Sequence, residues 1–353
     1  MNNWSLWSWP WLATLDMYRR ALESLDDAGP PARGGATEWA TPNVVALELS
    51  TLRLRDFSCP ESACAPVLVV APFAQHDAGL ADLAQGHSLV AALRANGCDN
   101  LFLVEWKSAT PATRLDTIDS QLAALNVAVD ELRAPVSLIG LCQGGWLSLL
   151  YASRFPQKLR KLVVAGAPVD LQAEPSALAA RVGTMDDASI DEILRLGKGL
   201  VLGRNMAALW PSEHDPAARL AQSLQFHGAP ATESEKNAAA AFERWDRRAL
   251  DLPGPYYRQV FDWLFRDNRL AAGNFPALGR EIALRELKCP LFLLAGAQDE
   301  IASPGQVFAA ASLVGAQEGQ IETALADCGH LALFMGRRTL TREWPRIAQW
   351  LAG

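Results

Sequence analysis

The sequence lacks the features that define several broad classes of protein. Lys and Arg number 32 and Asp and Glu 39, a formal net charge of −7, so no basic excess predicts a nucleic-acid partner. No apolar run is long enough for a transmembrane helix, and the N-terminus has neither the basic region nor the cleavage site of a signal peptide. With 50% hydrophobic and 20% charged residues, we expect the 353-residue chain to be a cytoplasmic globular protein with a substantial core.

The six cysteines also lack the spacing of a metal site or a disulfide framework. None forms a CxxC pair, and no histidine stands nearby at zinc-ligand spacing. Cys59 and Cys64 flank a short loop and are spaced for a local disulfide, an alternative that the missing secretion signal argues against. We therefore expect reduced thiols, and neither a metal nor a cofactor.

The most informative feature that is present is an apolar run over 136–141 that leads into Gly-x-Cys-x-Gly-Gly. This arrangement is typical of the nucleophile elbow of α/β-hydrolases, with Cys142 where serine is usual. A nucleophile on a sharp strand-to-helix turn needs small neighbours, which Gly140 and Gly144 provide, and the helix N-terminus favours a thiolate. The alternative is a glycine-rich turn around a buried structural cysteine.

Apolar runs and amphipathic segments alternate along most of the chain, which predicts an α/β fold with a mostly parallel, doubly wound sheet. We assign the α/β-hydrolase core to residues 36–170 and 288–353. Residues 171–287 contain helical patterns and no convincing core strand. Because hydrolase lids are commonly inserted at this place, we predict a helical cap there, before the strand that bears the acid. Core strands are expected at 45–49, 52–54, 66–71, 101–106, 136–141, 162–170, 289–299 and 320–324, and helices at 88–97, 115–132, 305–314 and the C-terminus.

The N-terminal segment, residues 1–35, differs in composition from the rest of the chain. Leucines follow its tryptophans at near-helical spacing, and residues 26–35 have the composition of a linker; the tryptophans are Trp4, Trp7, Trp9 and Trp11. Tryptophan favours an apolar–water boundary, so residues 1–25 are a candidate surface-binding segment. The alternative is a helix packed on the main domain.

In this fold the nucleophile, the acid and the base follow one another along the chain, each after its own strand. Cys142, Asp299 and His330 occur in that order, and His330 lies in a Gly-His turn after a late predicted strand. The imidazole would take the thiol proton and return it to the leaving group, while Asp299 fixes the orientation of the ring. Asp170 is the alternative acid, because it ends the predicted strand that follows the elbow. A helix cap or a turn is the other interpretation of Asp170.

The remaining site candidates are expected around these three residues. An oxyanion hole needs two backbone donors, and one should be the N–H of Gln143. The other should come from the loop after the first buried strand, where Phe73 or Ala74 is the expected donor. His76 in the same loop and Trp146 after the elbow are possible substrate contacts, although a structural role for His76 fits the sequence equally well.

These motifs resemble those of the polyhydroxyalkanoate synthases and the intracellular polyhydroxyalkanoate depolymerases, two cysteine-dependent groups of α/β-hydrolase relatives. Some segments look like the short synthases that work with a second subunit: Gly140-Leu-Cys-Gln-Gly-Gly145, Leu149-Leu-Tyr-Ala-Ser-Arg-Phe-Pro156 and Ala167-Pro-Val-Asp170. Other loops look more like the depolymerases: Val70-Ala-Pro-Phe-Ala-Gln-His76, Asp251-Leu-Pro-Gly-Pro-Tyr-Tyr257, Asp299-Glu-Ile-Ala-Ser-Pro-Gly-Gln306 and Gly329-His-Leu-Ala-Leu-Phe-Met-Gly336. The resemblance covers about residues 45–351.

The resemblance implies acyl-enzyme chemistry at Cys142 on hydroxyalkanoate esters. The chain departs from both groups, because synthases usually carry Asp-His where this chain has Asp299-Glu300, and depolymerases usually carry proline at the position of Gly144. We expect hydrolysis of poly- or oligo(3-hydroxyalkanoate). One alternative is a synthase that takes hydroxyacyl groups from coenzyme A thioesters, and another is a non-catalytic granule-associated protein.

The resemblance also implies particular partners. The hydroxyalkanoate polymer or oligomer, or a hydroxyacyl-coenzyme A, would bind at Cys142. Residues 1–25 would meet the surface of a polymer granule in the cytoplasm. A second copy of the chain or a second subunit is the expected protein partner.

Overall fold

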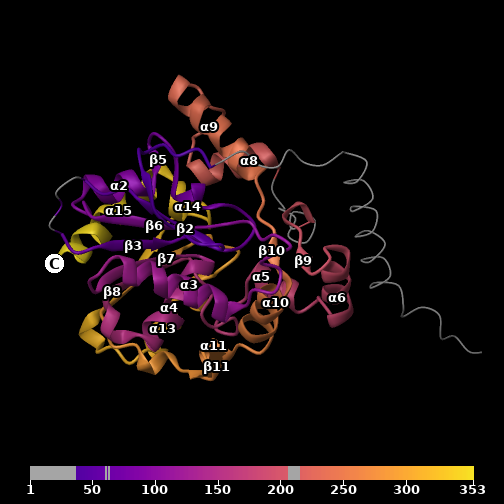
Figure 1. Ribbon diagram of the computed structural model, residues 1–353. Helices are drawn as coiled ribbons and strands as arrows, with labels where there is room; N and C mark the ends of the chain where they lie inside the picture. The colour runs from indigo at the N-terminus through magenta and orange to yellow at the C-terminus, as the bar shows by residue number, and fades with distance from the viewer. Residues whose placement is uncertain (1–36, 60–61, 63, 206–214) are drawn as a thin grey trace, which may run out of the picture.

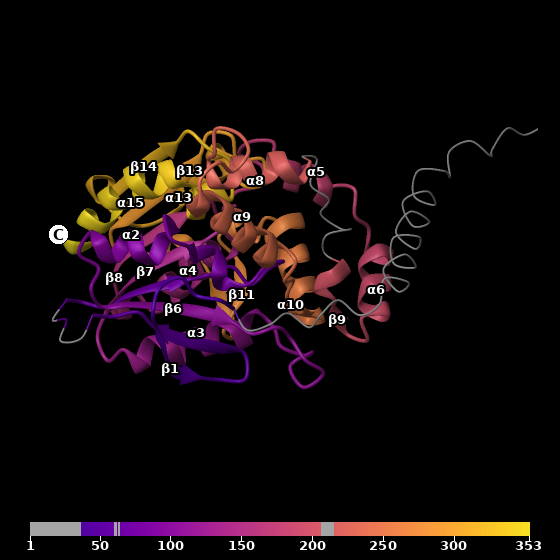
Figure 2. The ribbon, with the colours of Figure 1, turned by 90° about the horizontal axis from the view of Figure 1, so that it is seen from above.

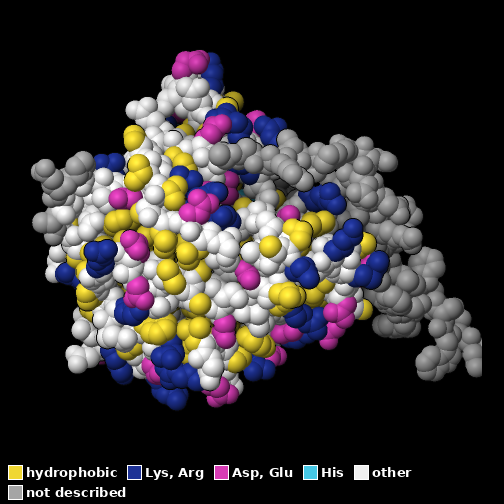
Figure 3. All heavy atoms as spheres, viewed as in Figure 1, with side chains coloured by type: hydrophobic (Ala, Val, Ile, Leu, Met, Phe, Trp, Pro, Cys, Tyr) yellow, Lys and Arg dark blue, Asp and Glu magenta, His cyan; other side chains and the backbone are white. Residues whose placement is uncertain are grey.

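The computed structural model describes residues 37–59, 62, 64–205 and 215–353 (Figure 1). The predicted surface segment at 1–25 and the linker after it lie outside the described residues. In the described part of the chain, no helix is both long enough and apolar enough to cross a membrane. On the face seen in Figure 3, Lys and Arg side chains are interspersed with Asp and Glu, and no continuous stripe of one charge crosses that face.

An eight-stranded sheet forms the centre of the fold, in the order β1-β2-β6-β3-β7-β8-β13-β14. The strands β1, β2 and β6 pair antiparallel at one edge, and the other neighbouring strands are parallel. This is the mostly parallel sheet that the sequence predicts, with an antiparallel edge. The strands are β1 (Val44–Glu48), β2 (Leu52–Asp56), β3 (Val67–Val70), β6 (Leu101–Trp106), β7 (Val136–Leu141), β8 (Leu159–Ala165), β13 (Leu291–Gly296) and β14 (Ile321–Ala326).

The central strands are apolar along their whole length because helices cover both faces of the sheet. Every residue of β3, β7 and β13 is buried. Alternate residues face opposite cores, so Leu138 packs with the helices on one side and Ile139 with those on the other. One face carries α2 (Leu89–Ala95), α14 (Ala332–Met335) and α15 (Arg337–Ala352), and the other carries α3 (Ile118–Glu131), α4 (Gln143–Arg154), α12 (Pro304–Phe308) and α13 (Ala310–Leu313) (Figures 1 and 2).

Several element boundaries differ from those expected, and two of the differences have a clear local cause. The helix α3 begins at Ile118 rather than at 115, because the side chain of Thr117 caps its first turn. The strand β8 begins earlier than expected and ends at Ala165, where Gly166 turns the chain with a φ of 57°. Asp170 therefore lies beyond the strand rather than at its end.

The chain between β8 and β13 contributes no strand to the eight-stranded sheet within the described residues, because β9 pairs with β10 and β11 pairs with β12. Its helices α5, α6 and α10 lie beyond the same side of the sheet in both views (Figures 1 and 2). This is the block for which the sequence predicts a cap. Its elements are α5 (Ala177–Val182), α6 (Asp187–Leu196), β9 (Leu200–Val201), α8 (Pro216–Leu224), α9 (Glu233–Asp246), β10 (Leu252–Pro253), α10 (Gly254–Gln259), the π-helix η3 (Val260–Arg266), α11 (Arg269–Ala272), β11 (Phe275–Ala277) and β12 (Arg280–Ile282).

Candidate active site

Cys142 occupies the turn between β7 and α4 in a conformation that is rare for a residue with a side chain. Its φ is 48° and its ψ is −117°. The turn is fixed on both sides, since the N–H of Cys142 donates to the carbonyl of Ala165 at 2.9 Å and its own carbonyl accepts the N–H of Gly145 at 2.8 Å. Strained backbone of this kind persists where the surrounding structure determines it, and it is characteristic of a nucleophile elbow.

The glycines around Cys142 leave no room for side chains. A Cβ atom at Gly140 would lie 2.5 Å from the Cα of Gly145, and one at Gly144 would collide with the carbonyl oxygen of Val70. The expectation that Gly140 and Gly144 must be small is therefore confirmed. Because neither glycine has a side chain, β7, α4 and β3 can approach closely enough to form the turn.

Asp299 and His330 come from the loops that follow β13 and β14. Nδ1 of His330 lies 2.7 Å from Oδ2 of Asp299. The other carboxylate oxygen, Oδ1, accepts the N–H groups of Ile301 and Ala302, each at 2.9 Å. Asp299 is only 5% exposed, so its carboxylate is held in one orientation by backbone donors and by the histidine.

The thiol of Cys142 lies near enough to the ring of His330 for its charge to affect the pKa of the imidazole. Burial by itself would lower the pKa of His330. The negative charge of Asp299 and its hydrogen bond to the ring, together with the nearby thiol of Cys142, outweigh burial and raise the pKa of His330 well above its ordinary value. The protonated imidazolium is therefore favoured, which is the form that stabilises a neighbouring thiolate.

A cavity of about 1280 Å³ opens beside Cys142. Its lining combines aliphatic and aromatic side chains with residues of the β3 loop, which we define as residues 72–77. Gln143, Phe73 and Ala74 all line it. Within the described residues, the N–H groups of Phe73 and Ala74 make no hydrogen bond, and that of Gln143 is at the first position of α4, where no partner within the helix exists. These donors are thus unpaired on residues that line the same cavity as Cys142.

His76 also lines the cavity, but most of its contacts are with the protein itself. Its Nδ1 lies 3.2 Å from the carbonyl oxygen of Arg248, its Nε2 lies 3.4 Å from Oδ1 of Asp246, and its ring centroid is 4.4 Å from that of Trp245. Burial lowers the pKa of His76 to about 4, which keeps the ring neutral at pH 7. A structural role is evident, and a substrate contact remains a prediction.

Trp146 and Asp170 do not reach this arrangement. Trp146 is fully buried outside the cavity lining, where its indole N–H donates to the side chain of Gln143 and its ring faces Phe275. We therefore no longer assign it a substrate contact. Oδ1 of Asp170 accepts Nδ2 of Asn268 at 2.7 Å and the N–H of Gln172 at 2.9 Å, which is the turn role given as its other interpretation.

Within the described residues, the other cysteines and the acidic residues form no second centre. All six cysteines are free, including Cys59 and Cys64. Cys328 is buried next to the hydroxyl of Thr339, and burial raises the pKa of its thiol to about 11. In the part of the chain that the structure describes, no group of three or more His, Cys, Asp and Glu residues is arranged to hold a metal ion.

A family model described as "Protein of unknown function (DUF3141)" matches residues 49–352. The chain belongs to this family. Among curated proteins, it is 27% identical over 305 residues to "Poly(3-hydroxyalkanoate) polymerase subunit PhaC" of Allochromatium vinosum, covering 84% of this chain and 83% of that protein. The protein of the same name from Synechocystis is 27% identical over 295 residues, covering 81% of this DUF3141 chain and 77% of the relative.

Solved structures confirm the fold class. A monoacylglycerol lipase from Paleococcus ferrophilus superposes with a TM-score of 0.55 at 15% identity, covering 85% of this chain and 98% of that one. The putative non-heme bromoperoxidase BpoC of Mycobacterium tuberculosis superposes with a TM-score of 0.52 at 14% identity, covering 87% and 99%. The DUF3141 chain therefore has the α/β-hydrolase fold, and the resemblance to the polyhydroxyalkanoate synthase group is confirmed. Since both curated relatives are named as polymerases, the comparison favours the synthase alternative over the depolymerase interpretation.

Sequence reasoning missed the residues that hold the β3 loop in place. They lie in the 245–256 segment, which runs from the end of α9 into α10. The N–H of Leu250 donates to the carbonyl of Gln75 at 2.8 Å, and the hydroxyl of Tyr256 donates to the carbonyl of Phe73 at 3.1 Å. No spacing rule connects such distant positions; the depolymerase-like Asp251–Tyr257 stretch was the only sequence signal near them.

Proposed function

We propose that this protein is a cysteine-dependent acyltransferase that accepts a 3-hydroxyacyl group from a thioester on Cys142 and passes it to a hydroxyl group. The observation that carries the proposal is the strained, positive-φ backbone of Cys142, with its thiol beside the ring of His330. A structural cysteine gains nothing from that strain. The polymerase name of the curated relatives supports a 3-hydroxyacyl thioester as the donor.

In the first step, the thiolate of Cys142 attacks the carbonyl carbon of the donor thioester. The carbon–sulfur bond to Cys142 forms, the bond to the donor sulfur breaks, and the imidazolium of His330 gives its proton to the departing thiolate. Asp299 keeps Nδ1 of the ring occupied, so that Nε2 exchanges the proton. A thiol nucleophile suits this step because exchange between two thioesters is nearly balanced in free energy.

In the second step, the terminal hydroxyl of a growing chain attacks the acyl group on Cys142. His330 takes the hydroxyl proton, an ester bond forms, and the thiolate of Cys142 leaves. In both steps the carbonyl oxygen becomes negatively charged in the tetrahedral state. The N–H of Gln143 and an N–H of Phe73 or Ala74 would stabilise that charge, because all of these residues line the cavity beside the thiol.

The charges in the cavity support a phosphorylated donor. Arginine side chains reach its lining from three separate segments of the chain, at Arg181, Arg219 and Arg338. Arg219 is paired with Asp246 at 2.6 Å, whereas Arg181 and Arg338 have no acidic partner within the described residues. Two guanidinium groups without an acidic partner, in a lining that also carries Asp246 and Glu300, would suit the phosphates of coenzyme A.

Hydrolysis of hydroxyalkanoate esters is the second candidate, favoured by the loops that carry Asp299 and His330. Their sequences are similar to the depolymerases, and Glu300, Ile301 and Leu331 from them line the cavity. Here water, activated by His330, would replace the chain hydroxyl in the second step. The same acyl-Cys142 would form, so only the acceptor separates the two candidates.

The test supplies the purified protein with 3-hydroxybutyryl-coenzyme A in one reaction and with oligomers of 3-hydroxybutyrate in another. We expect free coenzyme A together with lengthening oligomers in the first reaction. Cys142→Ala is the control, because it removes the nucleophile and leaves the fold. Release of 3-hydroxybutyrate from oligomers without polymer growth would support the hydrolase instead. If neither reaction occurs and mass spectrometry finds no acyl group on Cys142, both candidates fail and a non-catalytic granule-associated protein becomes the better interpretation.

A further inference from the structure

The 245–256 segment is hydrogen-bonded to the β3 loop at several points. Besides the bond from Leu250 to Gln75, the indole N–H of Trp245 donates to the carbonyl of Asp77 at 3.1 Å. His76 and Ala249 form an isolated antiparallel bridge between the two segments. The β3 loop therefore does not hold its shape alone, and residues far along the chain determine where its backbone groups point.

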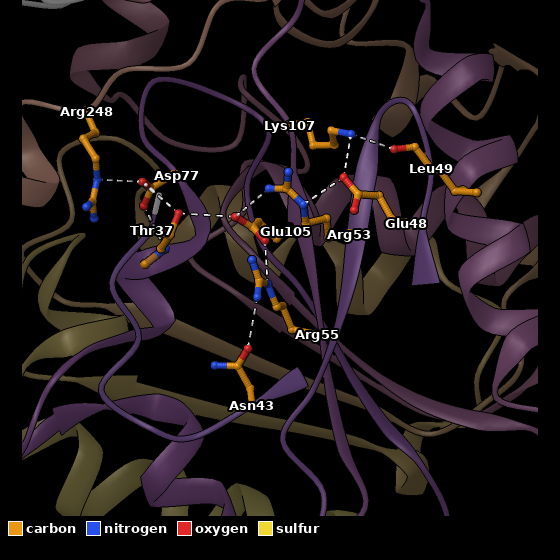
Figure 4. Close-up of polar contacts among 11 residues, drawn as sticks. Thr37, Asn43, Glu48, Leu49, Arg53, Arg55, Asp77, Glu105, Lys107 and Arg248 are labelled. Carbon is orange, nitrogen blue, oxygen red and sulfur yellow. Dashed lines mark hydrogen bonds and ion pairs between the residues drawn. The ribbon is translucent and has the colours of Figure 1, made fainter. Parts of the chain in front are cut away.

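A buried ion pair strengthens this attachment. Nε of Arg248 lies 2.9 Å from Oδ2 of Asp77, and both side chains are mostly buried. Figure 4 shows that Asp77 is linked onward through the hydroxyl of Thr37 to Glu105 of β6, which also binds Arg55 at 2.7 Å. The end of the β3 loop is thereby tied to the antiparallel edge of the sheet as well as to the 245–256 segment.

Tyr256 makes the contact closest to the candidate oxyanion donors. Its hydroxyl donates to the carbonyl of Phe73 at 3.1 Å, and the two rings pack with their centroids 5.0 Å apart. Tyr256 is 2% exposed and lines the cavity. Burial, and then the negative charge of Cys142, raise the pKa of Tyr256, so the hydroxyl keeps its proton and remains a donor.

The geometry of the peptide bond turns this contact into a constraint on Ala74. The carbonyl of Phe73 and the N–H of Ala74 belong to one planar trans peptide group and point in opposite directions. A hydrogen bond that fixes the carbonyl on Tyr256 therefore fixes the direction of the Ala74 N–H. That N–H makes no hydrogen bond within the described residues, so it is free to meet a reacting group.

We infer that Tyr256 is a positioning residue for acyl transfer: through its hydrogen bond to Phe73 it aims the N–H of Ala74 at the carbonyl oxygen of the group on Cys142. This inference rests on the proposed function, because it assumes a tetrahedral state on Cys142. It makes Ala74 the second oxyanion donor whose direction Tyr256 controls, whereas the N–H of Phe73 belongs to the preceding peptide group and is not fixed by this contact. A peptide that is free to tilt would stabilise the negative oxygen less well, although the substrate would still bind.

The experiment compares two reactions of Cys142 at pH 7 in Tyr256→Phe. Acylation by 3-hydroxybutyryl-coenzyme A or by p-nitrophenyl 3-hydroxybutyrate passes through a tetrahedral oxyanion. Alkylation by iodoacetamide uses the same thiolate but forms no oxyanion. We expect kcat for acylation to fall about 10- to 100-fold with KM within about twofold of the original value, while the rate of Cys142 alkylation, followed by peptide mass spectrometry, is unchanged.

Tyr151→Phe is the matched control. Tyr151 is also fully buried, and its hydroxyl donates to Asn126 at 3.1 Å, outside the cavity lining. The Tyr151→Phe variant therefore loses one hydrogen bond without any change at the β3 loop. Its acylation rate should equal that of the original protein. Replacing Tyr256 by p-aminophenylalanine, whose amine can donate to the same carbonyl, should restore most of the acylation rate.

Three results would overturn the inference. Equal acylation rates in the original protein and in Tyr256→Phe would show that the Tyr256 hydroxyl does not position the N–H of Ala74 for the reaction. A parallel fall of acylation and alkylation, or a failure of p-aminophenylalanine to restore the rate, would assign Tyr256 to the thiolate or to the fold. If instead the original protein is alkylated at Cys142 but never acylated, the proposed function itself has failed.

Discussion

Oδ2 of Asp299 lies 2.7 Å from Nδ1 of His330, on a carboxylate whose other oxygen is held by two backbone N–H groups. The carboxylate cannot turn without losing those donors, so the ring of His330 is fixed in direction. The positive charge on the ring is stabilised in a buried setting. The first two predictions depend on this pair.

Asp299→Asn should lower the rate of acyl transfer by about 10³- to 10⁴-fold, as in other triads whose acid is replaced by its amide. The asparagine oxygen would keep the backbone N–H groups, and its NH₂ group would then face Nδ1 and favour the wrong tautomer. Asp170→Asn is the comparison, because Asp170 is bound to Asn268 in a turn and should lose less than about tenfold. Single-turnover kinetics with 3-hydroxybutyryl-coenzyme A would rank the two variants. A reversed ranking would make Asp170 the acid.

The same pair predicts how the reactivity of Cys142 depends on pH. Because the pKa of His330 is raised, its imidazolium persists at pH 7 and stabilises the thiolate. Without the charge of Asp299, burial would lower the pKa of the ring, which would then be neutral at that pH. Iodoacetamide should therefore alkylate Cys142 more slowly in Asp299→Asn near pH 7, and at similar rates above about pH 9, where an ordinary thiol ionises unaided. Identical profiles would mean that Asp299 does not sustain the imidazolium.

Arg181 and Arg338 should affect the KM of a donor that carries phosphates and leave the KM of a donor without phosphates nearly unchanged. Arg181→Gln combined with Arg338→Gln should raise KM for 3-hydroxybutyryl-coenzyme A about tenfold or more, because contacts with its phosphates are lost. The KM for p-nitrophenyl 3-hydroxybutyrate, which has no phosphate, should change little. Arg342→Gln, on the exposed side of α15, is the matched control. An equal rise of both KM values would point to a change in the shape of the cavity.

The lowered pKa of His76 predicts that the folded protein loses stability in mild acid. Burial, with a smaller contribution from the charge of Arg219, outweighs the opposing effects of Asp246 and the Arg248 carbonyl and lowers the pKa of His76 to about 4. The unfolded chain binds this proton near pH 6.5, so the free energy of unfolding should decrease as the pH falls from about 6.5 to about 4, by up to about 1.4 kcal/mol per pH unit. His76→Asn, which keeps a donor for the Arg248 carbonyl, should flatten this part of the curve. Urea unfolding at several pH values would measure the slope, and parallel curves for the two proteins would contradict the prediction.

The proximity of Cys142, Asp299 and His330 could be predicted because each follows a strand of one parallel sheet. The carboxyl ends of parallel strands meet at a single edge, so chain order and strand ends were enough to bring residues of the elbow and of two later loops together. Gly140 and Gly144 were predictable for a similar reason, since a sharp turn tolerates no side chains. Their roles depended only on local geometry.

Other features depended on contacts that no local pattern reveals. Trp146 was a plausible substrate contact from its place after the elbow, but α4 is buried almost all round, and its sequence does not say which side faces the cavity. Asp170 was expected at a strand end, and the turn at Gly166 removed it from that position. Tyr256 was missed because its partner Phe73 is 183 residues away and contributes a backbone carbonyl, which any residue type could supply.

The neighbouring positions of β8 and β13 have a consequence for building chimaeric enzymes. Leu162 stands opposite Leu291, so the chain leaves the sheet and re-enters it on adjacent strands, however many residues lie between. Substrate range should therefore be transferable by exchanging that intervening stretch with the corresponding stretch of a relative. Such a transplant would have to bring its own equivalents of the bonds that Leu250 and Tyr256 make to the β3 loop. A donor stretch chosen for cavity shape alone would leave a well-folded but poorly reactive hybrid.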